Sequence, residues 1–137
     1  MPVRPEVLCF GLDPVLNRTR RLILQPAFDA CVASTLAEAA SWLQERRFRV
    51  ILLCQTLALD DARAALELVH TLQPEARILA FEDGLPRLAL RAPHQEVHLE
   101  GPTDLLHKVA AMAGVRLPAT GPRPAAKGPS KLPPAAE

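Results

Sequence analysis

The chain has 137 residues, enough for one domain, and its 49% hydrophobic and 23% charged residues are typical of an ordinary globular protein. A formal net charge of +1 gives no basic footprint of the kind that indicates DNA binding, and five aromatic residues offer little stacking surface for single-stranded nucleic acid. No apolar run approaches the roughly 18 residues that span a membrane, and the first run is too short for a signal peptide, so we expect a cytoplasmic protein.

The first half of the chain alternates strand and helix signals. An apolar run at 7–10 predicts a strand, and Asp13 followed by Pro14 predicts a helix that begins there and extends to about residue 24. Residues 28–33 predict a second strand. Thr35 and Glu38 have the spacing of a capping box before a helix over 37–47. The continuous apolar run 50–54 is the clearest strand of the sequence.

The second half continues this alternation. Asp60 and Asp61 are expected to cap a helix over 62–73, which Pro74 ends, and residues 78–81 predict a fourth strand. Between Pro86 and Pro93 the signals allow at best a short, irregular helix. A fifth strand is expected over 96–99. Thr103 and Asp104 would then cap a last helix over 105–113, closed by Gly114.

Five apolar strands alternating with helices predict an α/β fold with a parallel sheet covered on both faces. At this length, we expect a flavodoxin-like, doubly wound, five-stranded sheet of order 2-1-3-4-5. Residues 118–137 include six prolines and few large apolar residues, so we expect a disordered, mildly basic Pro/Ala-rich tail after a domain at 1–117. Ligands of such folds bind at the carboxyl ends of the strands, where the candidate residues are therefore sought.

Three segments carry a resemblance to the receiver (CheY-like) domain of bacterial two-component response regulators. They read VLCFGLDP, FRVILLCQTLAL and LEGPTDLLHKV, and they occur in the family's order and spacing within residues 5–114. The resemblance implies a phosphorylation site: two carboxylates after the first strand that hold Mg²⁺, and an aspartate after the third strand that accepts the phosphoryl group. A hydroxyl after the fourth strand and a lysine after the fifth bind the phosphoryl oxygens.

This sequence departs from the family pattern at each of those positions. The carboxylate pair falls on Gly11 and Leu12, and the phosphoacceptor falls on Cys54. The hydroxyl position falls on Phe81 or Glu82, and the lysine of the Lys-Pro step is Gly101. Each change removes a charge or an oxygen that the reaction needs. The resemblance therefore implies a degenerate pseudo-receiver that cannot be phosphorylated.

The remaining acidic residues and the cysteines have simpler explanations than catalysis. Asp13 could hold a cation together with Glu82, Asp83 or Glu100, but we favour its role as a helix cap. The three cysteines, Cys9, Cys31 and Cys54, lie in apolar runs, are odd in number and match no zinc signature, so neither a disulfide framework nor a metal site is expected. For Cys54 we favour inert packing over a reactive thiol.

No enzyme motif is present, so we expect no enzymatic activity and no cofactor. The sequence favours a phosphorylation-independent protein-interaction module in bacterial signalling, with an unidentified protein partner or a second copy of the chain. The expected partner face is the one that receivers use for dimerisation and output, and it carries Arg87, Arg91, His98 and Lys108. The alternative is a small-molecule or redox sensor that uses the strand-end pocket around Cys54.

Overall fold

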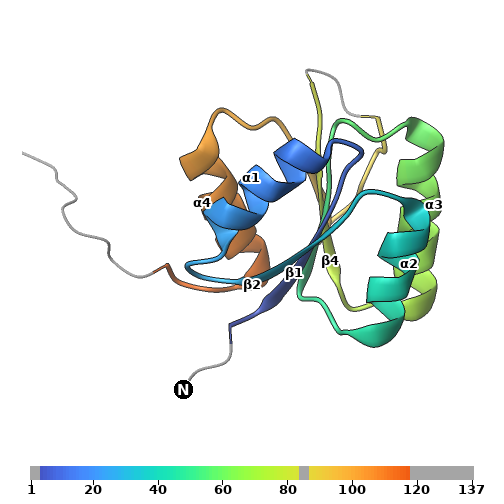
Figure 1. Ribbon diagram of the computed structural model, residues 1–137, viewed down its shortest axis with the longest axis horizontal. Coiled ribbons are helices and arrows are strands. Elements are labelled where there is room, and N and C mark those ends of the chain that lie inside the picture. Colours follow the sequence, from blue (N-terminus) through green and yellow to red (C-terminus); the bar gives the residue numbers. More distant parts are fainter. Residues whose placement is uncertain (1–3, 84–86, 118–137) are drawn as a thin grey trace, which may run out of the picture.

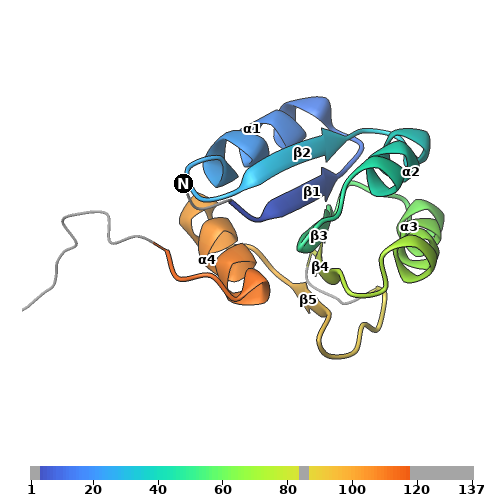
Figure 2. The same ribbon diagram turned by 90° about the horizontal axis from the view of Figure 1, so that it is seen from below.

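A computed structural model describes residues 4–83 and 87–117 (Figure 1). Its five parallel strands form one sheet in the order β2-β1-β3-β4-β5, which confirms the predicted doubly wound topology. The strands are β1 (Glu6–Phe10), β2 (Asp29–Ala33), β3 (Val50–Leu53), β4 (Arg77–Phe81) and β5 (Gln95–Val97). Helices α1 (Pro14–Leu24) and α4 (Pro102–Ala113) cover one face, and α2 (Leu36–Glu45) and α3 (Leu59–Leu72) cover the other (Figure 2).

Successive strand residues feed two separate cores, because side chains alternate across a sheet. Leu8, Phe10 and Ile51 belong to the core under α2 and α3, whereas Cys9 and Leu52 belong to the core under α1 and α4. Burial on both faces explains why the central strands β1, β3 and β4 appear in the sequence as nearly continuous apolar runs. No helix among the described residues is long and apolar enough to cross a membrane.

Three of the predicted helix ends are confirmed. The Asp13 carboxylate accepts hydrogen bonds from the first backbone N–H groups of α1, at 3.0 and 3.3 Å. The Thr35 hydroxyl accepts from the Glu38 N–H at 3.1 Å, and the Glu38 carboxylate accepts at 2.7 Å from Ser34, one residue before the usual partner in a capping box. Gly114 ends α4 in the left-handed conformation, with φ 70°.

The predicted caps of the other two helices are wrong. Helix α3 begins at Leu59, so Asp60 and Asp61 lie inside its first turn, where their charges favour the helix dipole without capping it. Helix α4 begins at Pro102 because proline is suited to the first helical position, and Asp104 therefore also lies within the helix. Its carboxylate accepts a hydrogen bond from the Glu100 N–H at 3.1 Å.

The segment between β4 and β5 contains no helix in its described residues, which are 82–83 and 87–94. Its backbone is held instead by Glu96, whose carboxylate accepts hydrogen bonds from the N–H groups of Arg87 at 2.7 Å and Leu88 at 2.9 Å. Leu88 and Leu90 pack against the core under α2 and α3. An irregular segment thus occupies the place of the predicted short helix. The predicted tail at 118–137 and Pro86 lie outside the described residues.

Candidate functional site

The positions that correspond to a receiver's phosphorylation site lie where the strands end. Gly11 follows β1, Cys54 follows β3 and Glu82 follows β4, and each extends the sheet by one backbone hydrogen bond. Gly11 donates to Ala33 at 3.1 Å, and Cys54 donates to the Phe10 carbonyl at 2.9 Å. Topology therefore brings the predicted positions to one edge of the sheet, as expected for this fold.

Gly11 and Cys54 are packed against each other. A Cβ atom at position 11 would lie 2.8 Å from the Cβ and Sγ atoms of Cys54 and 2.8 Å from the Asn17 Oδ1. These distances are shorter than ordinary van der Waals contacts of carbon with carbon, sulfur or oxygen, so only glycine fits here. The space that a carboxylate would need at position 11 is filled by the thiol and by the amide of Asn17.

The Cys54 thiol has a second thiol beside it. Its Sγ lies 3.7 Å from the Cys9 Sγ, and both residues are fully buried. The Oδ1 of Asn17 faces the two sulfur atoms at 3.9 and 4.0 Å, because its amide nitrogen donates to the Gly11 and Ala33 carbonyls at 2.8 and 3.2 Å. Asn17 thus joins the ends of β1 and β2 and presents an acceptor to the thiol pair.

A buried cation completes this cluster. Arg20 is 5% exposed, its Nη2 donates to the Gln55 Oε1 at 3.1 Å, and its guanidinium lies 4.7 Å from the centre of the Phe81 ring. The Nη1 atom is buried and has no hydrogen-bond partner among the described residues. A buried guanidinium group with an unsatisfied nitrogen is costly. Arg20 therefore marks a place where negative charge would be stabilised.

The two thiols differ in acidity because of the hydrogen bond between them and the charge of Arg20. The hydrogen bond with Cys9 lowers the pKa of Cys54, and the positive charge of Arg20 lowers it further, against the opposing effect of burial. The same hydrogen bond, together with burial, raises the pKa of Cys9 well above its ordinary value. Of the two thiols, Cys54 is the one that ionises first. We name the four side chains of Cys9, Asn17, Arg20 and Cys54 the thiol cluster.

The other candidate residues of the site are scattered. Asp13 is occupied as the cap of α1, and the buried Glu82 carboxylate lies 3.8 Å from the Nδ1 of the exposed His98. Gly101 has open space on the side where a side chain would lie, because a Cβ atom added there would have no atom within 4 Å. Among residues 4–83 and 87–117, no three His, Cys, Asp or Glu side chains are grouped so that they could hold a metal ion.

The four residues of the expected partner face come from the segment before β5, from just after the end of β5 and from α4. Arg87 donates to the Leu57 carbonyl at 2.9 Å and begins the segment that packs on the side of α2 and α3. Lys108 lies on α4, which covers the opposite face, and pairs with Asp104 at 3.1 Å. Arg91 and His98 are exposed. The described residues of this face between β4 and β5, 87–94, contain no helix.

Helix α1 carries a feature that sequence reasoning missed. It buries the polar residues Asn17 and Arg20 and leaves Val15 and Leu22 exposed, at 67% and 65%. With Leu12 at 46%, these are the exposed large hydrophobic residues of the described chain. The sequence does contain one indication of this burial. Asn17, Arg20 and Leu24 are three and four residues apart, so they lie on one face of the helix, and Leu24 indicates that this face is buried.

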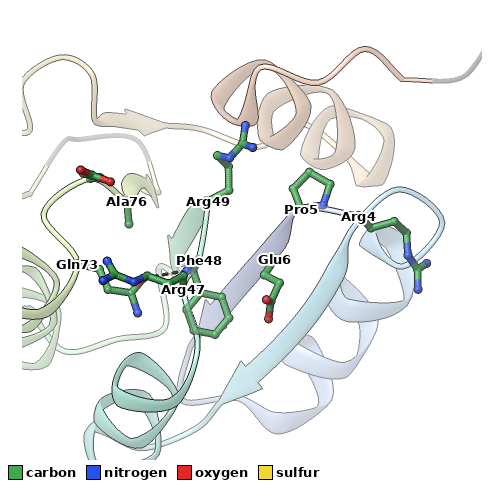
Figure 3. Close-up of a pocket in the computed structure, with 9 residues that line it drawn as sticks. Arg4, Pro5, Glu6, Arg47, Phe48, Arg49, Gln73 and Ala76 are labelled. Carbon is green, nitrogen blue, oxygen red and sulfur yellow. Dashed lines mark hydrogen bonds between the residues drawn. The ribbon is translucent and has the colours of Figure 1, made fainter. Parts of the chain in front are cut away.

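A hollow of about 390 Å³ lies at the opposite edge of the sheet, where the strands begin (Figure 3). Its arginines do not converge: Arg49 donates to the Ala113 carbonyl at 2.6 Å, and Arg4 donates to the Gln25 carbonyl. Figure 3 shows the guanidinium groups of Arg4 and Arg49 pointing in different directions. Arg4 and Arg49 therefore do not act together as a site that would hold an anion.

Comparisons with known proteins agree with this architecture. No protein-family model matches the sequence, and no curated protein sequence matches it. Among solved structures, a CheY-like response regulator receiver domain protein from Methanospirillum hungatei JF-1 is 18% identical, with a TM-score of 0.65, covering 82% of this chain and 95% of that one.

Two further structures are similar to the same extent. The receiver domain of the sensor histidine kinase PA1611 from Pseudomonas aeruginosa PAO1, with magnesium in its active-site cleft, is 15% identical with a TM-score of 0.67, covering 82% and 99% of the two chains. Vibrio cholerae chemotaxis protein CheY4 is 16% identical with a TM-score of 0.62, covering 80% and 99%. The chain therefore has the fold of a receiver domain, with a thiol cluster at the carboxyl edge of its sheet.

Proposed function

We propose that this chain is a protein-interaction module of a two-component or related signalling pathway, and that it works without phosphorylation. The observation that carries the proposal is the contact between Gly11 and Cys54. The site is not an empty receiver pocket that has lost one ligand: the space for an acidic side chain after β1 is filled. Neither a magnesium carboxylate nor a phosphoacceptor carboxylate stands at these positions.

A module of this kind acts by presenting a surface, and the most suitable surface is on α1. Leu12, Val15 and Leu22 are exposed, and Val15 and Leu22 lie seven residues apart, on the same side of the helix. The exposed Arg18 and Arg21 flank them, and α1 contains no acidic residue. Exposed apolar groups with a charged border are typical of interaction sites. An apolar surface bordered by carboxylates would complement this helix.

The absence of phosphorylation is tested by nuclear magnetic resonance of the labelled, full-length chain with Mg²⁺ and beryllofluoride, which imitates a phosphoryl group. We expect no saturable shift changes at residues 11–13, 54 or 81–82. Saturable changes that require both Mg²⁺ and beryllofluoride would contradict the proposal.

The surface is tested by comparing partner binding by two variants. Val15→Glu together with Leu22→Glu places charges on the exposed side of α1 without disturbing buried groups, whereas Arg91→Glu changes an exposed residue between β4 and β5. In affinity capture from the host, we expect the partner that the wild type retains to be absent with the α1 variant and present with Arg91→Glu. The reverse pattern would assign the partner to the face around β5.

A second candidate function, a redox sensor around Cys54, is favoured by one observation. Cys54 has a thiol neighbour, Cys9, at 3.7 Å between the sulfur atoms. The rate of thiol modification in the folded protein tests whether Cys54 is reactive. A Cys54 that only packs in the core would react no faster than the buried Cys31, whereas a redox sensor would react faster.

A further inference from the structure

We propose that Cys9 and Cys54 are a redox-active pair that a hydroperoxide converts into a disulfide, with Cys54 as the attacking thiol and Arg20 as the cation that holds its thiolate. This inference rests on the second candidate function and not on the interaction role. It adds the resolving thiol, the positioning cation and the chemical class of the oxidant.

Proximity is the first argument. The sulfur atoms lie 3.7 Å apart, and a disulfide requires about 2.05 Å, so they must approach by less than about 2 Å. In the sheet, Cys9 is level with Leu52, two residues before Cys54, so the two side chains meet diagonally across β1 and β3. Cys54 lies one residue beyond the end of β3, and its N–H donates to the Phe10 carbonyl of β1 at 2.9 Å, so the backbone holds the two thiols side by side and the remaining approach must come from their side chains.

Charge is the second and independent argument. The guanidinium of Arg20 is buried, and its Nη1 has no hydrogen-bond partner among the described residues. A thiolate at Cys54 would supply the missing counter-charge, since Arg20 also contacts Gln55, the next residue. The Asn17 Oδ1 lies at nearly equal distances from both sulfur atoms, 3.9 Å from Cys9 and 4.0 Å from Cys54, and can accept a hydrogen bond from whichever thiol stays protonated. With Arg20 next to the Cys54 side, the cluster would hold the thiolate at Cys54 and leave the proton on Cys9.

The chemistry follows from this arrangement. The Cys54 thiolate attacks one oxygen of the hydroperoxide, the O–O bond breaks, and the alcohol or water that leaves takes up a proton; Cys54 becomes a sulfenic acid. The Cys9 sulfur then attacks the Cys54 sulfur and displaces hydroxide, which leaves as water with the proton of the Cys9 thiol. In sum, two thiols and one hydroperoxide give one disulfide, one alcohol or water, and one water.

Access to the pair is controlled by the turn after β3. Both cysteines are fully buried, and the turn is fastened to the loop after β1 by the Leu12 N–H, which donates to the Thr56 Oγ1 at 3.1 Å. The oxidant must reach the thiols through local opening of this turn. Removing the hydroxyl in Thr56→Ala should therefore speed the oxidation without changing either thiol.

The test uses the full chain, reduced and folded, exposed to hydrogen peroxide with no partner present. After alkylation of the free thiols, peptide mass spectrometry locates the disulfide. We expect a Cys9–Cys54 disulfide in the wild type and in the matched control Cys31→Ser. In Cys9→Ser, Cys54 should be trapped by dimedone as a sulfenic acid, and in Cys54→Ser, Cys9 should remain a thiol.

Arg20 is tested by its effect on the rate. Arg20→Gln should slow the oxidation of Cys54 about tenfold, the change that one pKa unit causes in the thiolate fraction, and Arg20→Lys should restore part of the rate. Circular dichroism checks that the variants are folded. If Arg20→Gln does not fold, the rate of alkylation of each thiol is measured in the wild type at a series of pH values. Cys54 should ionise, and therefore react, at a lower pH than Cys31.

Three outcomes would overturn the proposal. One is oxidation of Cys31 as fast as that of Cys54 in the folded chain, and another is no disulfide between Cys9 and Cys54. The third is an Arg20→Gln protein that folds and oxidises at the wild-type rate. Because no partner takes part, these results are independent of whether the chain is an interaction module, which the beryllofluoride and capture experiments decide.

Discussion

Adding a single methyl group at position 11 tests whether the former phosphorylation site is filled. The Cβ of Gly11→Ala would lie 2.8 Å from three atoms: the Cβ and Sγ of Cys54 and the Oδ1 of Asn17. The Cβ of Cys54 is fixed to the backbone, so a rotation of its side chain cannot relieve the contact. The ends of β1 and β3 must therefore separate, and the Asn17 amide must also move away from its two carbonyl partners.

The magnitude follows from the cost of inserting a methyl group into a packed core. Overpacking of this kind costs about 1–3 kcal/mol of the free energy of unfolding. For a domain of this size, that corresponds to a decrease of about 4–8 °C in Tm per kcal/mol. Gly11→Asp places a larger side chain as well as a charge in the same filled space and should be more destabilising than Gly11→Ala.

Urea denaturation followed by circular dichroism measures the effect, and Gly101→Ala is the matched control. No atom lies within 4 Å of a Cβ at position 101, and its φ of 166° is extended backbone, which alanine adopts freely. We expect a loss of about 1 kcal/mol at most there, the cost of placing the less suitable alanine at a helix N-cap. If Gly11→Ala is as stable as Gly101→Ala, the site has room for a side chain and the argument for a filled site fails.

Two further predictions concern residues away from the site. Gln73→Ala should lower the free energy of unfolding by about 1–3 kcal/mol, because the buried Gln73 amide accepts a hydrogen bond from the Phe48 N–H at 2.8 Å and donates one to the Leu43 carbonyl at 2.8 Å. The control in the same denaturation assay is Gln44→Ala, which changes an exposed residue. Equal stability of the two variants would refute the role of Gln73. His94 accepts a hydrogen bond from the Ile78 N–H at 3.0 Å, and burial lowers the pKa of His94 below its usual value. The unfolded chain therefore binds the proton more readily, so the free energy of unfolding should fall as the pH falls through about 6.5. His94→Gln should make the free energy of unfolding less dependent on pH in this range. If the variant keeps the pH dependence of the wild type, His94 is not its cause.

The sequence was sufficient for the sheet, because each central strand is buried on both faces and therefore appears as a continuous apolar run. It was also sufficient where a helix start is decided locally, as at Asp13, whose side chain reaches the next backbone N–H groups. It failed at Asp60, because α3 already begins at Leu59, and at Asp104, because proline at position 102 starts α4 two residues earlier. The segment before β5 depends on Glu96, whose bonds to the backbone of Arg87 and Leu88 no periodicity reveals.

The site was predicted in its positions but not in its chemistry. Alignment with a receiver placed Gly11 and Cys54 at one edge, and the structure brings them into contact. The partners of Cys54 could not be inferred, because Cys9 meets it diagonally and Arg20 reaches it from a helix whose polar side faces inward. Polar residues on a helix are ordinarily expected to face solvent, and only their partners on other elements decide otherwise.

The most direct test of the central claim is the response of the full-length chain to Mg²⁺ and beryllofluoride, measured residue by residue with nuclear magnetic resonance. A receiver site filled by a thiol cluster predicts spectra in which the signals of Gly11, Asp13 and Cys54 do not change up to millimolar concentrations of both. Saturable shifts at these residues that require both additives would show a working phosphoryl site and would contradict the account.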